Sequence, residues 1–266
     1  MKVLLIETAT QVCSVALAEG DSIIARRESD EPNAHSSHLA VYVDEILNEC
    51  GLKPADIDAV CVSSGPGSYT GLRIGVSSAK GLCYALGKPL IAVPTLESMA
   101  ALYYRQHSDY QGMVCPMIDA RRMECYTMMV KGGQGQMEIL RDTHADILDD
   151  ADQLSLFNSF LDRGEVTFIG DGAAKTQPLL GTHPNARFDL DFRLSAEGMA
   201  DIAVRKLAEG KTEDIAYFEP FYLKDFVAKK SVVRGLTPAP SPEKRGERNS
   251  SVANNSPLLP GEGFRG

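Results

Sequence analysis

A glycine-rich segment from Ser63 to Gly75, SSGPGSYTGLRIG, has the residue types of a phosphate-binding turn. It follows an apolar, strand-like run and precedes a predicted helix, where backbone N–H groups can cradle a phosphate. Its spacing matches neither of the two common fingerprints. No lysine completes a P-loop after Gly65 or Gly67, and Thr70 stands where the dinucleotide motif requires its third glycine. The spacing therefore favours another explanation for these glycines.

Other chemistry-bearing residues do not form recognisable sites. His35 and His38 can share a helical face, but two ligands do not complete a metal site, and no cysteine or carboxylate cluster stands nearby. We therefore expect no metal site, and solvated or interface histidines instead. Ser68 lacks a G-x-S-x-G elbow, so a peptidase is not predicted. The six cysteines never approach CxxC spacing, which argues against a metal ribbon or a disulfide framework.

The elements that position these residues occur in an order that repeats. In both halves, three strands are followed by alternating helices and strands, and the first strand ends in an acid before small residues, at Glu7 and Asp119. The strands are predicted at 3–8, 12–18, 22–28, 57–63, 89–93, 113–119, 124–130, 136–141 and 166–169, and the helices at 35–50, 69–86, 95–106, 151–162 and 195–209. We interpret this order as an internal duplication that gives an α/β fold with two lobes facing a cleft.

Composition divides the chain into three parts. We predict an N-terminal lobe over 1–110, a C-terminal lobe over 111–230, and a disordered tail over 231–266 that is rich in Pro, Ser, Asn and Gly. The net charge is −9, of which the tail contributes +2. An acidic body is a poor stand-alone binder of nucleic acid. No run is long enough to span a membrane or to serve as a signal peptide, so we expect a reducing, cytoplasmic setting.

The helix predicted over 69–86 contains three glycines, each of which costs about 1 kcal/mol relative to alanine. Gly71, Gly75 and Ser78 recur on one stripe of this helix. Stripes of small residues allow a neighbouring backbone to approach closely. Two explanations remain open at this point: burial of the helix within its own lobe, and packing of the helix against another chain.

Four blocks of the sequence resemble a known family. MKVLLIETATQVCSVAL, SSGPGSYTGLRIG, IDARRMECY and EPFYLKD are similar, in this order, to the TsaB family of bacterial threonylcarbamoyladenosine biosynthesis proteins. The resemblance covers about residues 1–230 and does not extend to the tail. It implies an actin-like, Hsp70-like and sugar-kinase-like (ASKHA) fold with two lobes derived from a duplicated β-β-β-α-β-α unit.

The resemblance also implies a role and partners. Members of this family look like non-catalytic scaffold subunits that dimerise with themselves or with the catalytic subunit TsaD, and the small ATPase TsaE joins them. The complex adds threonylcarbamoyl to the adenosine next to the anticodon of tRNA, and tRNA would bind only through the complex. The family's dimer surface matches two helices here, with predicted interface residues His35, His38, Leu39, Tyr42, Ile46, Tyr69, Gly71, Arg73, Ile74, Gly75, Ser78 and Leu82.

Four residues resemble those that line the nucleotide cleft in relatives of this fold. Glu7 and Asp119 stand where actin-like ATPases hold acids near the phosphate and Mg²⁺, and Gly170 and Gly172 stand where the nucleoside approaches. Glu7 replaces the usual aspartate, and its extra methylene moves the carboxylate inward by about an ångström. We therefore expect a degenerate cleft with no catalytic residue and no required cofactor, in which the acids cap the strand ends. Weak binding of ATP or ADP with Mg²⁺, and a stand-alone ATPase or phosphotransferase, are the alternatives.

Overall fold

The computed structural model describes residues 1–133 and 136–223, all of which lie in the unit Met1–Phe226. The predicted disordered tail, 231–266, lies outside the described residues. The predicted lobe boundary near residue 110 stays a prediction.

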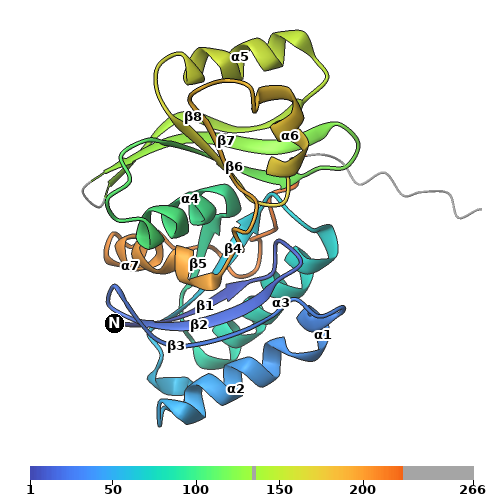
Figure 1. Ribbon diagram of the computed structural model, residues 1–266. Coiled ribbons are helices and arrows are strands. Elements are labelled where there is room, and N and C mark those ends of the chain that lie inside the picture. Colours follow the sequence, from blue (N-terminus) through green and yellow to red (C-terminus); the bar gives the residue numbers. More distant parts are fainter. Residues whose placement is uncertain (134–135, 224–266) are drawn as a thin grey trace, which may run out of the picture. The chain divides into compact units, whose positions relative to one another are not determined.

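Two five-stranded sheets with equivalent strand orders form the framework of this unit (Figure 1). The first sheet has the order β3-β2-β1-β4-β5 and the second β8-β7-β6-β9-β10. In each sheet three strands pair antiparallel and two more add in parallel beside the first of them. The strands are β1 (Lys2–Glu7), β2 (Cys13–Glu19), β3 (Ser22–Ser29), β4 (Ala59–Gly65), β5 (Leu90–Pro94), β6 (Met113–Asp119), β7 (Glu124–Gly133), β8 (Gln136–Ile147), β9 (Val166–Ile169) and β10 (Ala186–Asp189). The matching orders confirm the predicted α/β fold built from a duplicated unit.

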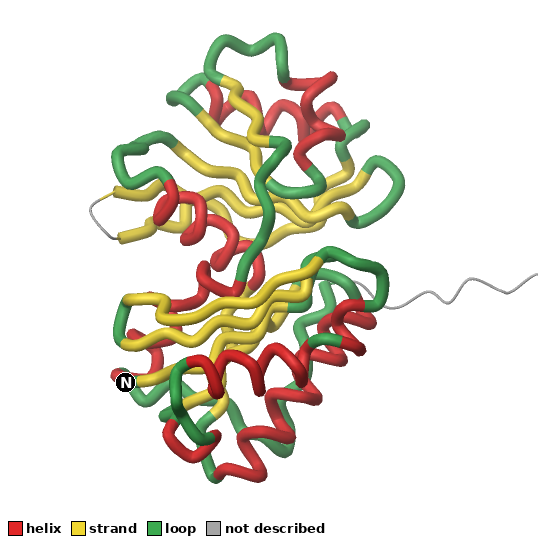
Figure 2. The backbone as a smooth tube through the Cα atoms, turned by 60° about the horizontal axis from the view of Figure 1, so that its bottom comes forward, coloured by secondary structure: helices red, strands yellow, loops and turns green. Residues whose placement is uncertain are grey.

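Helices cover both faces of each sheet. Because successive side chains of a strand point to opposite faces, Leu4 and Ile6 pack under α2 and α3, whereas Val3 and Leu5 pack against η2 and α7. Helix α4 packs on the second sheet, and α5 and α6 pack on its other face. Figure 2 shows helices between the two sheets and on their outer sides. The helices are α1 (Ala34–Ser37), α2 (Leu39–Glu49), η1 (Pro54–Asp56), α3 (Tyr69–Leu86), α4 (Thr95–Gln106), α5 (Ala151–Leu161), α6 (Ala173–Leu180), η2 (Ala196–Met199) and α7 (Ala200–Ala208).

Helix α3 has clear start and stop signals in the sequence. The Ser68 hydroxyl accepts a hydrogen bond from the Gly71 backbone N–H at 3.2 Å, which caps the first turn. Gly87 ends the helix in the left-handed region, with φ of 63°. Ser68 therefore has a structural role as the N-cap of this helix.

The structure differs from the sequence-based prediction in four elements. Helix α6 and strand β10 were not predicted, because both are short and α6 contains Pro178. The predicted helix over 35–50 is divided at His38 into α1 and α2, and the one over 195–209 begins with the 3₁₀ turn η2. In the described ranges, none of the helices combines the length and hydrophobicity needed to cross a lipid bilayer.

Candidate functional site

The two predicted cleft acids end equivalent strands of the two sheets. Glu7 is the last residue of β1 and Asp119 the last residue of β6, and each strand is the third in its sheet. The surroundings of the two side chains differ. Glu7 is fully buried, whereas the Asp119 side chain is 40% exposed.

The Glu7 carboxyl group lies in the protein interior. Its Oε1 accepts hydrogen bonds from the Ala9 backbone N–H at 2.7 Å and from the Ser63 hydroxyl at 2.8 Å. Its Oε2 has no hydrogen-bond partner among the described residues. Burial raises the pKa of Glu7 from 4.5 to about 7, although the two hydrogen bonds favour the ionised form. Near neutral pH a large fraction of this group is therefore uncharged.

The Asp119 carboxylate is held by groups at the surface. Its Oδ1 accepts from the Lys175 ammonium at 2.5 Å and from the Arg121 backbone N–H at 2.6 Å. The Asp119 backbone N–H donates to Asp171 Oδ1 at 2.9 Å. Lys175 lies on α6, so the contact joins two elements that are 56 residues apart in sequence. The charge of Asp119 is thus compensated by Lys175, which lies on a helix that packs on the same sheet.

Gly170 and Gly172 both lie against β6. Gly170 has φ of +93°, and a Cβ there would collide with the Met117 carbonyl oxygen. A Cβ on Gly172 would meet the Cys125 Sγ at 2.9 Å. Close packing onto β6 therefore accounts for both glycines without a ligand.

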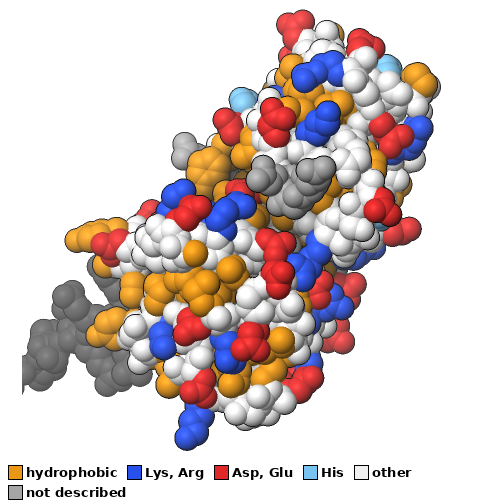
Figure 3. Space-filling view, turned by 90° about the vertical axis from the view of Figure 1, so that its left-hand side faces the viewer, with side chains coloured by type: hydrophobic (Ala, Val, Ile, Leu, Met, Phe, Trp, Pro, Cys, Tyr) orange, Lys and Arg blue, Asp and Glu red, His pale blue; other side chains and the backbone are white. Residues whose placement is uncertain are grey.

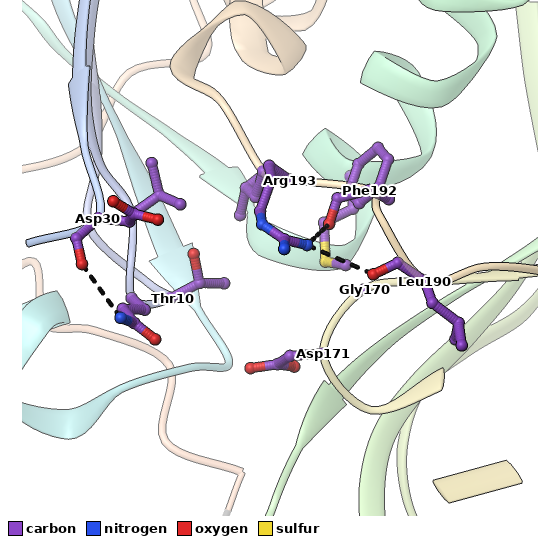
Figure 4. Close-up of a pocket in the computed structure, with 11 residues that line it drawn as sticks. Thr10, Asp30, Gly170, Asp171, Leu190, Phe192 and Arg193 are labelled. Carbon is purple, nitrogen blue, oxygen red and sulfur yellow. Dashed lines mark hydrogen bonds between the residues drawn. The ribbon is translucent and has the colours of Figure 1, made fainter. Parts of the chain in front are cut away.

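A cavity of about 350 Å³ opens beside these strand ends (Figure 4). Its lining includes the buried side chains of Met99 and Phe192 and the charged residues Asp30, Asp171 and Arg193. The Arg193 guanidinium donates to the carbonyl oxygens of Leu190 and Phe192. The lining residues are Thr10, Gln11, Val12, Asp30, Met99, Gly170, Asp171, Leu190, Phe192, Arg193 and Leu194.

Of the four predicted cleft residues, Gly170 lines this cavity, whereas Glu7, Asp119 and Gly172 are not among its lining residues. Sequence reasoning missed Asp30 and Arg193. Both lie in loops that carry no motif, and Arg193 follows the unpredicted strand β10. Nucleotide binding in this cleft stays a prediction.

The two histidines lie in different environments. His35 Nε2 is buried without a partner among the described residues, and desolvation lowers the pKa of His35. The His38 ring stacks on Tyr42 with centroids 5.3 Å apart, and its Nδ1 lies 3.1 Å from the Ser37 hydroxyl. Across the part of the chain that the structure describes, no group of three or more His, Cys, Asp or Glu residues is arranged to hold a metal ion.

Four of the predicted interface residues belong to the chain's own core. Leu39 and Ile46 on α2 are buried under the first sheet. Gly71 and Gly75 face Thr8 at the end of β1, where an added Cβ would collide with the Thr8 carbonyl oxygen and hydroxyl respectively. The prediction that these two glycines admit a neighbouring chain is wrong, because their small size is required by packing inside the chain.

The other predicted interface residues reach the surface to different degrees. Arg73 is exposed, and its guanidinium lies 5.4 Å from the centroid of the Tyr69 ring, which also packs on Tyr222. Half-buried residues on α1, α2, α3 and the His38 junction complete this surface: His35, His38, Tyr42, Tyr69, Ile74, Ser78 and Leu82. An interface formed by these eight residues stays a prediction.

Comparisons with known proteins give a consistent result. A family model described as "TsaD: tRNA N6-adenosine threonylcarbamoyltransferase" matches residues 29–255. The Escherichia coli K12 tRNA threonylcarbamoyladenosine biosynthesis protein TsaB is 34% identical over 239 residues, which cover 87% of this chain and 98% of that protein. The Bacillus subtilis protein of the same description is 36% identical over 138 residues, 52% of this chain and 58% of that protein.

A solved structure shares the fold. YeaZ from Pseudomonas aeruginosa superposes with a TM-score of 0.71 at 26% sequence identity. The match covers 84% of this chain and 99% of the YeaZ chain. The similarity therefore includes both sheets rather than one half of the duplicated unit.

Proposed function

Because the chain belongs to the TsaB family of tRNA threonylcarbamoyladenosine biosynthesis proteins, we propose that it is a non-catalytic, dimerising scaffold subunit in this modification of tRNA. In this proposal it forms a homodimer, or a heterodimer with the catalytic subunit TsaD, and the ATPase TsaE joins the complex. The complex transfers threonylcarbamoyl to the adenosine next to the anticodon.

The observation that carries the non-catalytic assignment is the state of the two strand-end acids. Phosphoryl transfer in this type of cleft needs carboxylates that face the phosphate and its metal ion. Glu7 is enclosed in the interior with a pKa near 7, and Asp119 is paired with Lys175. Neither carboxylate lines the cavity. This arrangement supports a subunit that requires no nucleotide or metal of its own.

The exposed face of α3 supports a partner surface. Gly81 lies on this face, and an added Cβ would meet no atom of the chain within 4 Å. Unlike Gly71 and Gly75, it therefore has no internal packing reason, although glycine inside a helix costs about 1 kcal/mol relative to alanine. Ser77, one turn earlier, is also small and exposed. A neighbouring helix could approach closely along this line.

Charge supports indirect contact with tRNA. The chain has a net charge of −9, and on the face in Figure 3 the Lys and Arg side chains are scattered among Asp and Glu. Phosphate binding rests on clustered Lys and Arg. We therefore assign tRNA binding to the partner, and we expect no gel shift of tRNA by the isolated protein at low salt.

The proposal is tested by co-purifying the chain with TsaD and measuring threonylcarbamoyladenosine in a reconstituted reaction. We expect Gly81→Leu to abolish both the homodimer and TsaD binding while the monomer stays folded, because the new side chain occupies open space on the partner surface. Ser155→Leu adds the same side chain to an exposed position of α5 and should change neither. Retention of both complexes by Gly81→Leu would contradict the proposed surface.

Calorimetry tests the non-catalytic part separately. We expect no tight binding when ATP and Mg²⁺ are added to the isolated protein, and no modified tRNA when TsaD is omitted. Tight binding that disappears in Asp119→Ala would instead favour a nucleotide-using enzyme.

A further inference from the structure

The ammonium group of Lys175 lies among three oxygen atoms at the end of β6. Its Nζ is 2.5 Å from Asp119 Oδ1, 2.6 Å from the Arg122 carbonyl oxygen and 3.5 Å from the Glu124 carbonyl oxygen. The Lys175 side chain is only 21% exposed. A cation supplied by the chain itself is therefore enclosed by one carboxylate and two carbonyl groups.

This oxygen set has the chemistry of a hard-cation site. Mg²⁺, Mn²⁺ and Ca²⁺ take carboxylate and carbonyl oxygens, and Mg²⁺ often uses one or two carboxylates with water completing its shell. A metal ion at these oxygens would have to occupy the position of the ammonium, and two cations a few ångströms apart repel each other. The Mg²⁺ that the resemblance places near Asp119 does not fit the residues present.

We propose that Lys175 takes the place of a divalent cation at the end of β6 and so closes this strand end to Mg²⁺. The inference deepens the proposed non-catalytic role, since it names the residue that excludes the metal. It concerns metal binding by the isolated chain, so its failure leaves the test of complex formation unaffected.

The turn after β6 holds the oxygen atoms that contact the Lys175 ammonium in a defined position. Asp119 is fixed from two sides, because its Oδ1 accepts from the Arg121 N–H and its own N–H donates to Asp171. Arg121 and Arg122 have φ of 69° and 54°, a left-handed conformation that residues other than glycine rarely adopt. The turn that presents the Arg122 carbonyl to Lys175 is thus specific, and its oxygens would remain close together if the ammonium were removed.

A second lysine provides a matched control. The Lys80 ammonium also contacts two carbonyl oxygens, those of Phe218 at 2.9 Å and Ala216 at 3.4 Å. No carboxylate in the described part of the chain forms an ion pair with Lys80. Removal of Lys80 should therefore leave no metal site, because carbonyl oxygens alone lack the negative charge of Asp119.

The test uses Mn²⁺ alone as the probe and the full chain, with free Mn²⁺ measured by electron paramagnetic resonance. We expect the wild-type protein and Lys80→Met to leave the free Mn²⁺ signal unchanged. Lys175→Met keeps the length of the side chain without its charge, and it should remove the signal of one Mn²⁺ per chain. Asp119→Asn in the Lys175→Met background should restore the signal.

Two results would overturn the inference. One is a folded Lys175→Met protein, verified by circular dichroism, that leaves as much free Mn²⁺ as the wild type. The other is a wild-type protein that already binds one Mn²⁺ per chain and loses it on Asp119→Asn. If Lys175→Met does not fold, Lys175→Gln is measured in the same way with the same expected and contradicting results.

Discussion

At the end of β1 the carboxyl group of Glu7 is enclosed by protein, whereas at the equivalent end of β6 the carboxylate of Asp119 lies at the surface beside an ammonium. The strand orders of the two sheets match, so backbone position alone does not explain the difference. The neighbours explain it. Ser63 on β4 and the turn after β1 surround Glu7, while α6 brings Lys175 to Asp119.

The comparison shows that the two equivalent carboxyl groups of this duplicated fold are accommodated in different ways. Burial disfavours the charged form of Glu7, and an ion pair compensates the charge of Asp119 without burying it. The first arrangement should contribute strongly to pH-dependent stability. The second should contribute weakly and in a salt-dependent manner. Three substitutions test this contrast, from the largest expected effect to the smallest.

The first prediction concerns the pH dependence that Glu7 produces. The unfolded chain loses this proton near pH 4.5 and the folded chain near pH 7, so Glu7's contribution to stability is present below pH 4.5 and is lost as the pH rises through 7. A shift of this size corresponds to about 3 kcal/mol. The test is urea unfolding of both proteins between pH 4.5 and 8. The free energy of unfolding of Glu7→Gln, relative to that of the wild type, should rise by about 3 kcal/mol as the pH increases over this range. Parallel pH profiles of the two proteins would show that Glu7 is not the titrating group.

The second prediction concerns packing beside Glu7. The added methyl of Gly75→Ala would collide with the Thr8 hydroxyl, and overpacking of this kind typically costs about 2 kcal/mol. Gly81→Ala is the control on the same helix, because its methyl meets no atom within 4 Å. The control should be unchanged or more stable by up to about 1 kcal/mol. Equal midpoints of thermal unfolding for the two variants would show that the end of β1 is not tightly packed.

The third prediction concerns the ion pair at β6. Asp119→Asn should lower the free energy of unfolding by about 1 kcal/mol at low salt, because the pair is partly exposed. The loss should shrink as salt is added, since ions screen exposed charges. Urea unfolding of both proteins at low and high salt measures it. A loss of several kcal/mol that does not respond to salt would place Asp119 in the same class as Glu7.

Much of the fold could be predicted from the sequence. The acids that end β1 and β6, each followed by small residues, indicated the duplication that the sheet orders confirm. Helix α3 was predicted with its observed bounds, Tyr69–Leu86, and the structure shows that Ser68 and Gly87 cap its two ends. Short elements were harder: α6 has eight residues and contains a proline, so its periodicity is weak.

The candidate site was less predictable, because its contacts are long-range. Helical periodicity placed Gly71 and Gly75 on one face but could not show that this face meets Thr8 of the same chain. The pairing of Lys175 with Asp119 depends on the position of α6, which the sequence did not reveal. Arg193 follows an unpredicted strand and carries no motif, so nothing in the sequence assigned it to the cavity.

The contact of α3 with Thr8 at two successive helical turns has a mechanical consequence. The helix cannot slide along the sheet or sink toward it without displacing the end of β1. Its outer face therefore moves with the sheet as one stiff body. Association through a face of this kind loses little conformational freedom, so more of the contact energy remains available as affinity.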